Sequence, residues 1–95
     1  MSVWNKLFYH LLHCMWFVYI VICNDDTLYT GIAKDVEKRV FDHNTSNIWA
    51  KYTKSRRPVS LVWYKKVVDR QTAAKLEYTI KKMWREKKEH LITWK

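Results

Sequence analysis

The sequence has little glycine, proline or cysteine: one, one and two residues among 95. Cys14 and Cys23 have no CxxC spacing and no second pair of cysteines around them, which argues against a disulfide framework and a zinc site. We interpret both as reduced thiols, and such thiols are typical of a cytoplasmic protein. The one glycine, Gly31, lies two residues after Tyr29, so any structural need that only glycine meets is expected there.

The sequence also lacks a hydrophobic run long enough to span a membrane. Residues 7–23 contain no Lys, Arg, Asp or Glu, but they include His10 and His13 and are fewer than the roughly 20 residues that a spanning helix needs. No small-residue cleavage motif follows them, which argues against a signal peptide. We therefore expect no membrane span, and divide this run into a helix-like or loose segment up to Cys14 and a buried strand.

Acidic residues are scarce relative to basic ones, with 9 Asp and Glu against 18 Lys and Arg and a formal net charge of +9. The length suits one domain, and the 48% of hydrophobic residues is typical of a folded core. A field of this sign favours polyanions, so nucleic acid is the first expected partner and an anionic membrane surface the second.

Two strands and a turn are predicted at residues 17–33. Residues 17–23 are aromatic and β-branched, residues 24–26 favour a turn, and residues 27–33 form the returning strand. A two-residue loop would place Tyr19 and Tyr29 on opposite faces of this hairpin. A three-residue loop or a bulge would place both on one face.

A short helix is predicted to begin at Asp35 and to extend through the segment DVEKRVFDHN. At about 100° per residue, Val36, Arg39, Val40 and His43 share one side of it. Arg39 and His43 are therefore expected on the inward-facing side, where an unpaired arginine is rare.

A polar, basic connection follows at residues 45–58 and ends at Pro58. It has two interpretations: a solvated loop, or a loop that holds phosphates with aromatic side chains beside them. In the second interpretation the candidate nucleic-acid-binding residues are Lys51, Thr53, Lys54, Arg56 and Arg57, interleaved with Trp49 and Tyr52.

A third strand is predicted at residues 59–66, followed by a long helix that Asp69 caps and that runs toward His90. The apolar stripe of this helix is Ala73, Leu76, Ile80, Met83 and Trp84. Glu77 lies at the edge of the stripe, where an ion pair with Lys81 at i+4 is the ordinary interpretation. The expected fold class is a small α+β layer: three antiparallel strands with helices packed against them.

The ordered motifs resemble the small stand-alone branch of the GIY-YIG nuclease domain family. Phe17-Val18-Tyr19 stands where that family has Gly-Ile-Tyr, and Tyr29-Thr30-Gly31 stands where it has Tyr-Ile-Gly. The segments GIAKDVEKRVFDHN, AKYTKSRRPVSLVWY and AAKLEYTIKK are similar to its later blocks. The resemblance covers residues 15–92 and implies a GIY-YIG endonuclease-like fold.

The resemblance implies a catalytic set of Tyr19, Tyr29, Arg39, His43 and Glu77. Tyr19 would be the general base with Tyr29 assisting, Arg39 would hold the scissile phosphate, and His43 would orient a phosphate or relay a proton. Glu77 would bind a divalent metal, Mg²⁺ or alternatively Mn²⁺. Gly31 would let the chain pass close to the tyrosines; a simple β-bulge is the alternative. No Asn follows Asn47, so a late Asn that some members place near the metal has no counterpart, and Lys81 or Lys82 could take its space.

The implied function is a metal-dependent endonuclease that hydrolyses DNA phosphodiester bonds in repair, recombination or processing. Because no second domain is expected, we predict weak sequence specificity, with recognition of a nick, flap or branch, or a protein partner that supplies specificity. RNA is the alternative substrate, and a non-catalytic nucleic-acid-binding module is the alternative function. A membrane-surface protein is a third hypothesis.

Residues 1–14 precede the resemblance, and Met15-Trp16 has the form of a start in similar proteins. We interpret residues 1–14 as an N-terminal extension with Met15 as an alternative start, and residues 15–92 as the nuclease-like domain.

Overall fold

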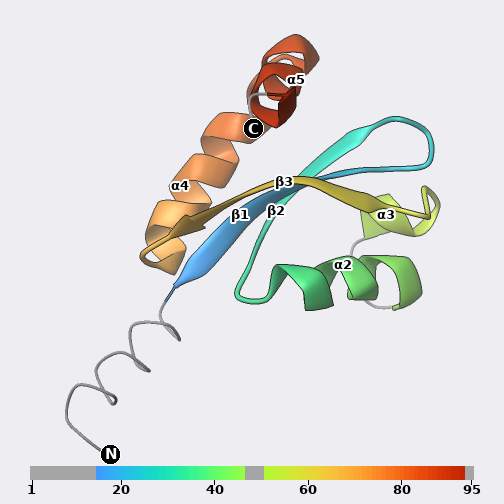
Figure 1. Ribbon diagram of the computed structural model, residues 1–95, viewed down its shortest axis with the longest axis horizontal. Helices are drawn as coiled ribbons and strands as arrows, with labels where there is room; N and C mark the ends of the chain where they lie inside the picture. The colour runs from blue at the N-terminus through green and yellow to red at the C-terminus, as the bar shows by residue number, and fades with distance from the viewer. Residues whose placement is uncertain (1–14, 47–50, 94–95) are drawn as a thin grey trace, which may run out of the picture.

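The fold is a three-stranded antiparallel sheet with helices on both faces, which confirms the predicted fold class. A computed structural model describes residues 15–46 and 51–93. The elements are β1 (Trp16–Ile22), β2 (Leu28–Ala33), α2 (Val36–Thr45), α3 (Lys51–Lys54), β3 (Ser60–Val67), α4 (Arg70–Lys81) and α5 (Arg85–Thr93). Figure 1 shows α4 and α5 on one side of the sheet and α2 with α3 on the other.

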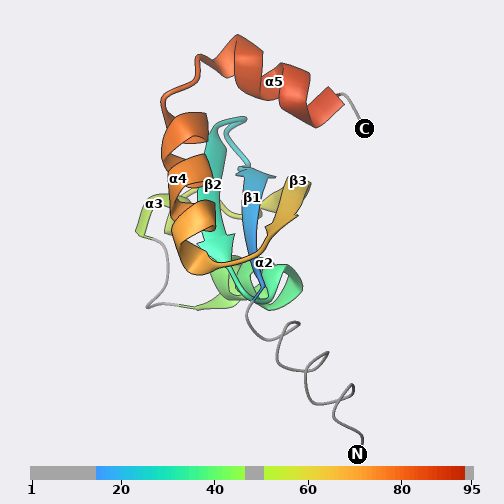
Figure 2. The same cartoon turned by 90° about the vertical axis from the view of Figure 1, so that its left-hand side faces the viewer.

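The strand order is β2-β1-β3, so β1 is central and each of the other two strands forms an edge. Alternate residues of β1 bury their side chains in two separate cores. Tyr19 and Val21 pack with Val36 of α2 and with Val59. Val18 and Ile20 pack with Trp63 and with Ala73 and Ile80 of α4. Figure 2, turned by 90°, shows α4 and α5 around one face of the strands and α2 at the other.

Both predicted helix starts are confirmed by their capping hydrogen bonds. The Asp35 carboxylate accepts from the backbone N–H of Lys38 at 3.0 Å, and the Asp69 carboxylate accepts from that of Thr72 at 2.7 Å. These contacts satisfy N–H groups that a helix leaves unpaired in its first turn.

The predicted long C-terminal helix is wrong, because two helices stand in its place. α4 ends at Lys81, and the N–H of Met83 turns back to the carbonyl of Ile80 at 3.0 Å. The Trp84 carbonyl then accepts from Lys87 and Lys88 to begin α5. The break removes Trp84 from the apolar stripe and leaves its side chain 86% exposed, whereas Ala73 and Ile80 are fully buried as predicted.

Within the described ranges, no helix has the length and apolar character to cross a membrane. Cys23 is a buried free thiol. Cys14 and the interpretation of residues 1–14 as an extension lie outside the described residues.

Candidate active site

Tyr19 and Tyr29 lie on the same face of the sheet because the hairpin loop contains three residues. The Cys23 N–H donates to the Thr27 carbonyl at 2.8 Å, and Asp26, in the loop between them, has a left-handed φ of 66°. The resulting register pairs Tyr19 with Gly31 and Val21 with Tyr29. Of the two loops that the sequence allowed, the three-residue loop is the one that forms.

Gly31 provides space for the ring of Tyr19. A Cβ atom on residue 31 would lie 2.5 Å from the Tyr19 hydroxyl oxygen and 2.7 Å from Cζ. Gly31 has no positive φ, and the β1–β2 register continues regularly through it, so the alternative of a bulge at this glycine is wrong. The irregular pairing lies instead between β1 and β3, after Ile20.

His43 is the buried centre of the site. Its Nε2 lies 2.7 Å from the Tyr19 hydroxyl and its Nδ1 lies 2.9 Å from the Thr53 hydroxyl, while the side chain is 1% exposed. Burial, and then the positive charge of Arg39, lower the pKa of His43, so the neutral imidazole is favoured. The prediction that His43 faces inward from α2 is confirmed.

Tyr19 is 1% exposed, and its pKa lies well above the ordinary value. Burial is the main cause, and the nearby Tyr29 and Glu77 add to it. The charge of Arg39 and its hydrogen bond to Tyr19 act in the opposite direction. Tyr19 therefore stays a neutral phenol at ordinary pH.

Glu77 reaches this cluster from α4, a helix whose buried residues pack on the other face of the sheet. Its carboxylate lies 3.5 Å from the Lys81 ammonium, as the i+4 spacing predicts, and its side chain is 23% exposed. The Lys81 ammonium also lies 5.9 Å from the centre of the Tyr29 ring. Two strands, β1 and β2, and two helices, α2 and α4, thus bring Tyr19, Tyr29, Arg39, His43 and Glu77 to one place.

Residues 15–90 match the family model described as the GIY-YIG catalytic domain. The chain belongs to the GIY-YIG family. This confirms the family that the sequence motifs indicated, and it assigns the domain a nuclease-like fold.

Similar proteins carry the name UPF0213. One from Desulfotalea psychrophila is 49% identical over 77 residues, which cover 81% of this chain and 70% of that protein. One from Staphylococcus saprophyticus is 51% identical over 77 residues, which cover 81% and 93%. The solution NMR structure of a UPF0213 protein from Bacillus halodurans is similar with a TM-score of 0.55, 38% identity and 85% coverage of each chain.

GIY-YIG nucleases generally use divalent metals, and Glu77 is the metal ligand that the sequence resemblance predicts here. The described residues contain no group of three or more His, Cys, Asp or Glu side chains that could enclose an ion. A single partly exposed carboxylate suits a hard cation such as Mg²⁺, which keeps several of its waters. Lys81 lies on the same carboxylate and would have to share it with the ion.

The predicted nucleic-acid-binding loop of the GIY-YIG domain is used mainly for internal contacts. Thr53 is fully buried against His43, so the expectation of a surface contact to nucleic acid is wrong for this residue. Arg57 donates to the His43 carbonyl at 2.5 Å and to the Ser46 carbonyl. Arg56 binds the Asp25 carboxylate at 2.9 Å. Lys54 is exposed, and the side chain of Lys51 lies outside the described residues.

Two residues with a role in the site were missed by the sequence analysis or misassigned. Thr53 holds the ring of His43. Asn44 joins α2 to Val59, the residue before β3, through the nitrogen and the oxygen of its side-chain amide. The Asn44 amide donates to the Val59 carbonyl at 3.0 Å and accepts from the Val59 N–H at 2.7 Å. Neither residue is marked by periodicity; Asn44 was visible only as the residue after His43 in a family motif.

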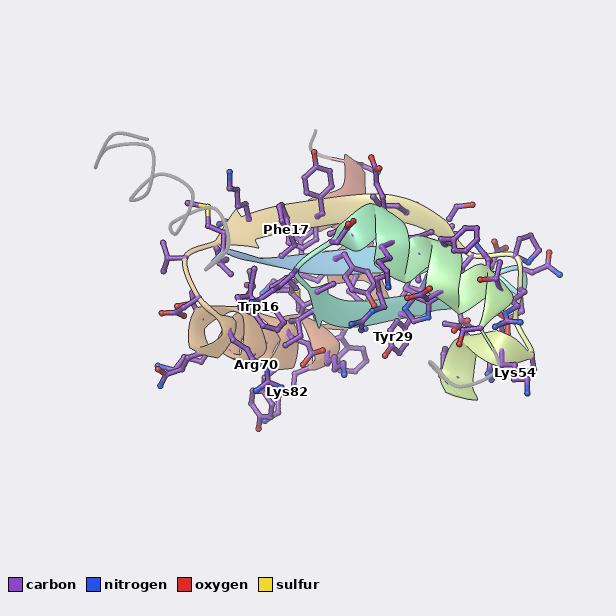
Figure 3. The ribbon with its side chains drawn as sticks, turned by 90° about the horizontal axis from the view of Figure 1, so that it is seen from below. Trp16, Phe17, Tyr29, Lys54, Arg70 and Lys82 are labelled. Carbon is purple, nitrogen blue, oxygen red and sulfur yellow. The ribbon has the colours of Figure 1, made fainter. Side chains whose placement is uncertain are left out.

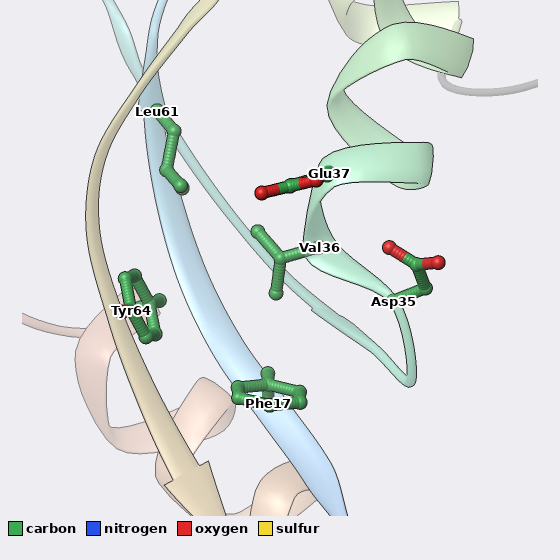
Figure 4. Close-up of a pocket in the computed structure, with 6 residues that line it drawn as sticks. All are labelled: Phe17, Asp35, Val36, Glu37, Leu61 and Tyr64. Atoms are coloured by element: carbon green, nitrogen blue, oxygen red, sulfur yellow. The ribbon is translucent and has the colours of Figure 1, made fainter.

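A separate pocket lies between β3 and the start of α2 (Figure 4). Its lining residues are Phe17, Asp35, Val36, Glu37, Leu61 and Tyr64. None of the five predicted catalytic residues lines it, and β3 is the edge of the sheet opposite β2. This pocket therefore lies outside the candidate active site.

Proposed function

We propose that this GIY-YIG protein is a metal-dependent endonuclease that hydrolyses DNA phosphodiester bonds. The observation that carries the proposal is the convergence of a tyrosine pair, an arginine, a neutral histidine and a carboxylate around the Tyr19 hydroxyl. This group combines a proton acceptor, a cation for a phosphate and a ligand for a divalent ion, which phosphodiester hydrolysis requires.

Tyr19 and His43 act together in proton transfer. The Arg39 guanidinium donates to the Tyr19 oxygen, so we assign the phenol proton to the bond with Nε2 of neutral His43. Nδ1–H of His43 then donates to the Thr53 hydroxyl. Because burial opposes a free phenolate, Tyr19 accepts a proton from the attacking water only as it passes its own to Nε2.

Arg39 holds the scissile phosphate. It lines a surface depression together with Lys34 and Lys38 and with the carboxylates of Asp35 and Asp42, so three cations and two anions border this opening. A phosphate there meets a planar donor suited to its oxygens. Tyr29, whose ring meets that of His43 edge-on at 5.3 Å, assists Tyr19.

Glu77 would hold the divalent ion, Mg²⁺ or alternatively Mn²⁺. A bound ion supplies Lewis-acid stabilisation of the charge that develops on the phosphate oxygens. The ion would compete with the Lys81 ammonium, which lies 3.5 Å from the same carboxylate. The nuclease recognises a nick, flap or branch in DNA repair or recombination, or a protein partner supplies its specificity.

The test is cleavage of plasmid and of labelled nicked, flapped and four-way DNA with Mg²⁺ or Mn²⁺. Glu77→Ala is expected to lower the rate at least about 100-fold, as loss of a group that stabilises transition-state charge does. Glu86→Ala, on α5, is the matched control with the same change of charge. Binding without cleavage by the wild type, on every substrate and with either metal, would reject the nuclease and leave the nucleic-acid-binding module.

A further inference from the structure

Cation–aromatic pairs recur along one side of the molecule. The Arg56 guanidinium lies 4.1 Å from the centre of the Tyr52 ring, and the Lys82 ammonium lies 4.4 Å from that of Tyr78. Lys34 and Arg70 both lie over Trp16, at 5.4 and 5.7 Å. Lys81 over Tyr29 completes the set.

The pairs on Tyr29, Tyr52 and Tyr78 lie on β2, α3 and α4 next to the candidate active site, whereas Trp16 begins the central strand β1. Tyr52 of α3 stacks on Tyr29 of β2 with centroids 5.7 Å apart, and Lys81 of α4 lies over Tyr29. Figure 3 shows Arg70, Lys82, Tyr29 and Lys54 along one side of the molecule. Arg70 and Lys82 are separated by about 18 Å along the helix direction at 1.5 Å per residue.

The pair on α4 is exposed and has no evident role in the fold. Tyr78 is 61% exposed, and it directly follows Glu77. Lys82 likewise follows Lys81, the residue that pairs with Glu77. Tyr78 and Lys82 therefore lie about 100° around the helix from Glu77 and Lys81, respectively. The Tyr29 and Tyr52 rings already stack on each other, and Arg56 pairs with Asp25. The side chains at that end of the β2 edge are therefore held by contacts within the protein. Tyr78 is more exposed than Tyr52, which is 41% exposed.

The charge along α4 matches a phosphate backbone. Residues 70–82 contain four cations, Arg70, Lys75, Lys81 and Lys82, and one anion, Glu77. Single rings separated by cations suit a chain in which bases alternate with phosphates. An apolar protein partner would favour a continuous apolar patch instead.

We propose that a single-stranded nucleic-acid segment lies along the β2 edge, with Tyr78 and Lys82 forming a nucleotide subsite beside the candidate active site. The Tyr78 ring stacks on a base, and the Lys82 ammonium binds the adjoining phosphate. This inference rests on the proposed function and deepens it: the substrate is unpaired next to the bond that is cut.

The experiment measures binding of the full chain to a fluorescein-labelled 20-nucleotide oligothymidylate by fluorescence anisotropy in EDTA, where no metal-dependent cleavage occurs. Tyr78→Ala is expected to weaken binding roughly 5- to 100-fold, as loss of one base–aromatic stack does. Tyr78→Phe keeps the ring and is expected to bind like the wild type. On a blunt 20-base-pair duplex, whose bases are already stacked, Tyr78→Ala is expected to have little effect.

Lys82→Gln tests the phosphate contact separately and does not depend on whether Tyr78→Ala folds. It is expected to reduce the slope of log K against log salt by about 0.7, the value for one phosphate of a single strand. The matched controls are Tyr64→Ala and Lys66→Gln on β3, the opposite edge of the sheet, where Tyr64 is 50% exposed.

Equal binding by Tyr78→Ala and wild type, or an equal loss in Tyr64→Ala, overturns the subsite. An equal loss on the duplex overturns the single-strand assignment. These outcomes are independent of the Glu77→Ala cleavage result: cleavage with unchanged Tyr78→Ala binding rejects only the subsite, and a Tyr78-dependent complex that is never cleaved rejects only the nuclease.

Discussion

At the scale of single residues, the site depends on Tyr19 lying directly over a position that has no side chain. The Tyr19 ring occupies the space that a Cβ on residue 31 would take, and its hydroxyl reaches His43 from there. The tight approach leaves little freedom for the ring, which favours one geometry for the bond to Nε2. Substitutions at this contact are therefore expected to be coupled.

Gly31→Ala is expected to lower the free energy of unfolding by about 1–3 kcal/mol, the usual cost of overpacking. It also displaces the Tyr19 hydroxyl and lowers the cleavage rate. Urea unfolding of Gly31→Ala, Tyr19→Phe and the double variant measures the coupling. Because phenylalanine lacks the atom at 2.5 Å, the cost of Gly31→Ala should be smaller beside Tyr19→Phe; simple additivity would contradict the proposed clash.

Thr53→Val removes the partner of His43 Nδ1 while keeping the shape of the side chain. We expect a loss of about 1–3 kcal/mol, the cost of leaving a buried polar group unpaired. The Nδ1–H tautomer should no longer dominate in ¹⁵N NMR spectra of the ring, and cleavage should slow. Thr53→Ser keeps the hydroxyl and is the control. A Val variant with the wild-type tautomer and rate would show that Thr53 does not position His43.

Thr30 stands where the family signature has isoleucine, and it is 3% exposed. Its hydroxyl is buried without a hydrogen-bond partner among the described residues. Thr30→Val should therefore raise the free energy of unfolding, by about 1 kcal/mol, because it removes an unpaired polar group at almost constant volume. Thermal or urea unfolding measures it, with Thr30→Ser as the comparison. A less stable Val variant would mean that the hydroxyl has a partner.

At the scale of elements, the break between α4 and α5 lets α4 and α5 pack on the same core from two directions. α4 keeps Ile80 in the core and Glu77 at the site, while α5 turns back so that Leu91 and Ile92 pack in the same core. Arg85, the first residue of α5, donates to the Asp26 carbonyl in the hairpin loop and also pairs with Glu89 at 3.0 Å. The loop that sets the tyrosine register is thus in contact with the C-terminal helix.

Trp84→Ala tests the position of this break. An 86% exposed tryptophan contributes little, so the free energy of unfolding should change by less than about 0.5 kcal/mol. A tryptophan in the apolar stripe of a continuous helix would cost about 3–5 kcal/mol when truncated. Ile80→Ala, at a fully buried position of α4, is the matched control and should cost about 2–5 kcal/mol. Comparable losses in the two variants would support the continuous helix.

At the scale of the whole molecule, a central strand divides two cores, and the site is assembled on the α2 side with one carboxylate from the α4 side. The buried residues on the α2 side include His43. Burying a charged imidazole there would be costly, so packing favours the neutral form. Protonation of this histidine is therefore linked to unfolding of the domain.

The stability of the protein should fall as the pH drops below about 6.5, the ordinary histidine value. The pKa of folded His43 is lowered, so the unfolded chain binds the proton first and stability is complete only above that range. One such group contributes a slope of at most about 1.4 kcal/mol per pH unit. Urea unfolding at pH 7.5, 6.5 and 5.5 should show a shallower dependence in His43→Gln; identical slopes would contradict the linkage.

Much of the fold was predictable because its signals are local. Helix caps at Asp35 and Asp69, the β-branched and aromatic run of β1, and the inward side of α2 all depend on neighbours within a few residues. The break after Lys81 had no such signal, since no glycine or proline stands there. Thr53 was misassigned because a threonine in a basic loop gives no indication of a histidine ten residues away.

The sequence by itself determined the family, the fold class and the identity of the five candidate catalytic residues, because motif order and periodicity are properties of the chain. Only the tertiary structure decided which face the two tyrosines share, why residue 31 has no side chain, and which hydroxyl holds His43. These features depend on a loop register and on contacts between residues 10 to 24 positions apart. Such contacts arise only when separate elements pack, so no local pattern specifies them.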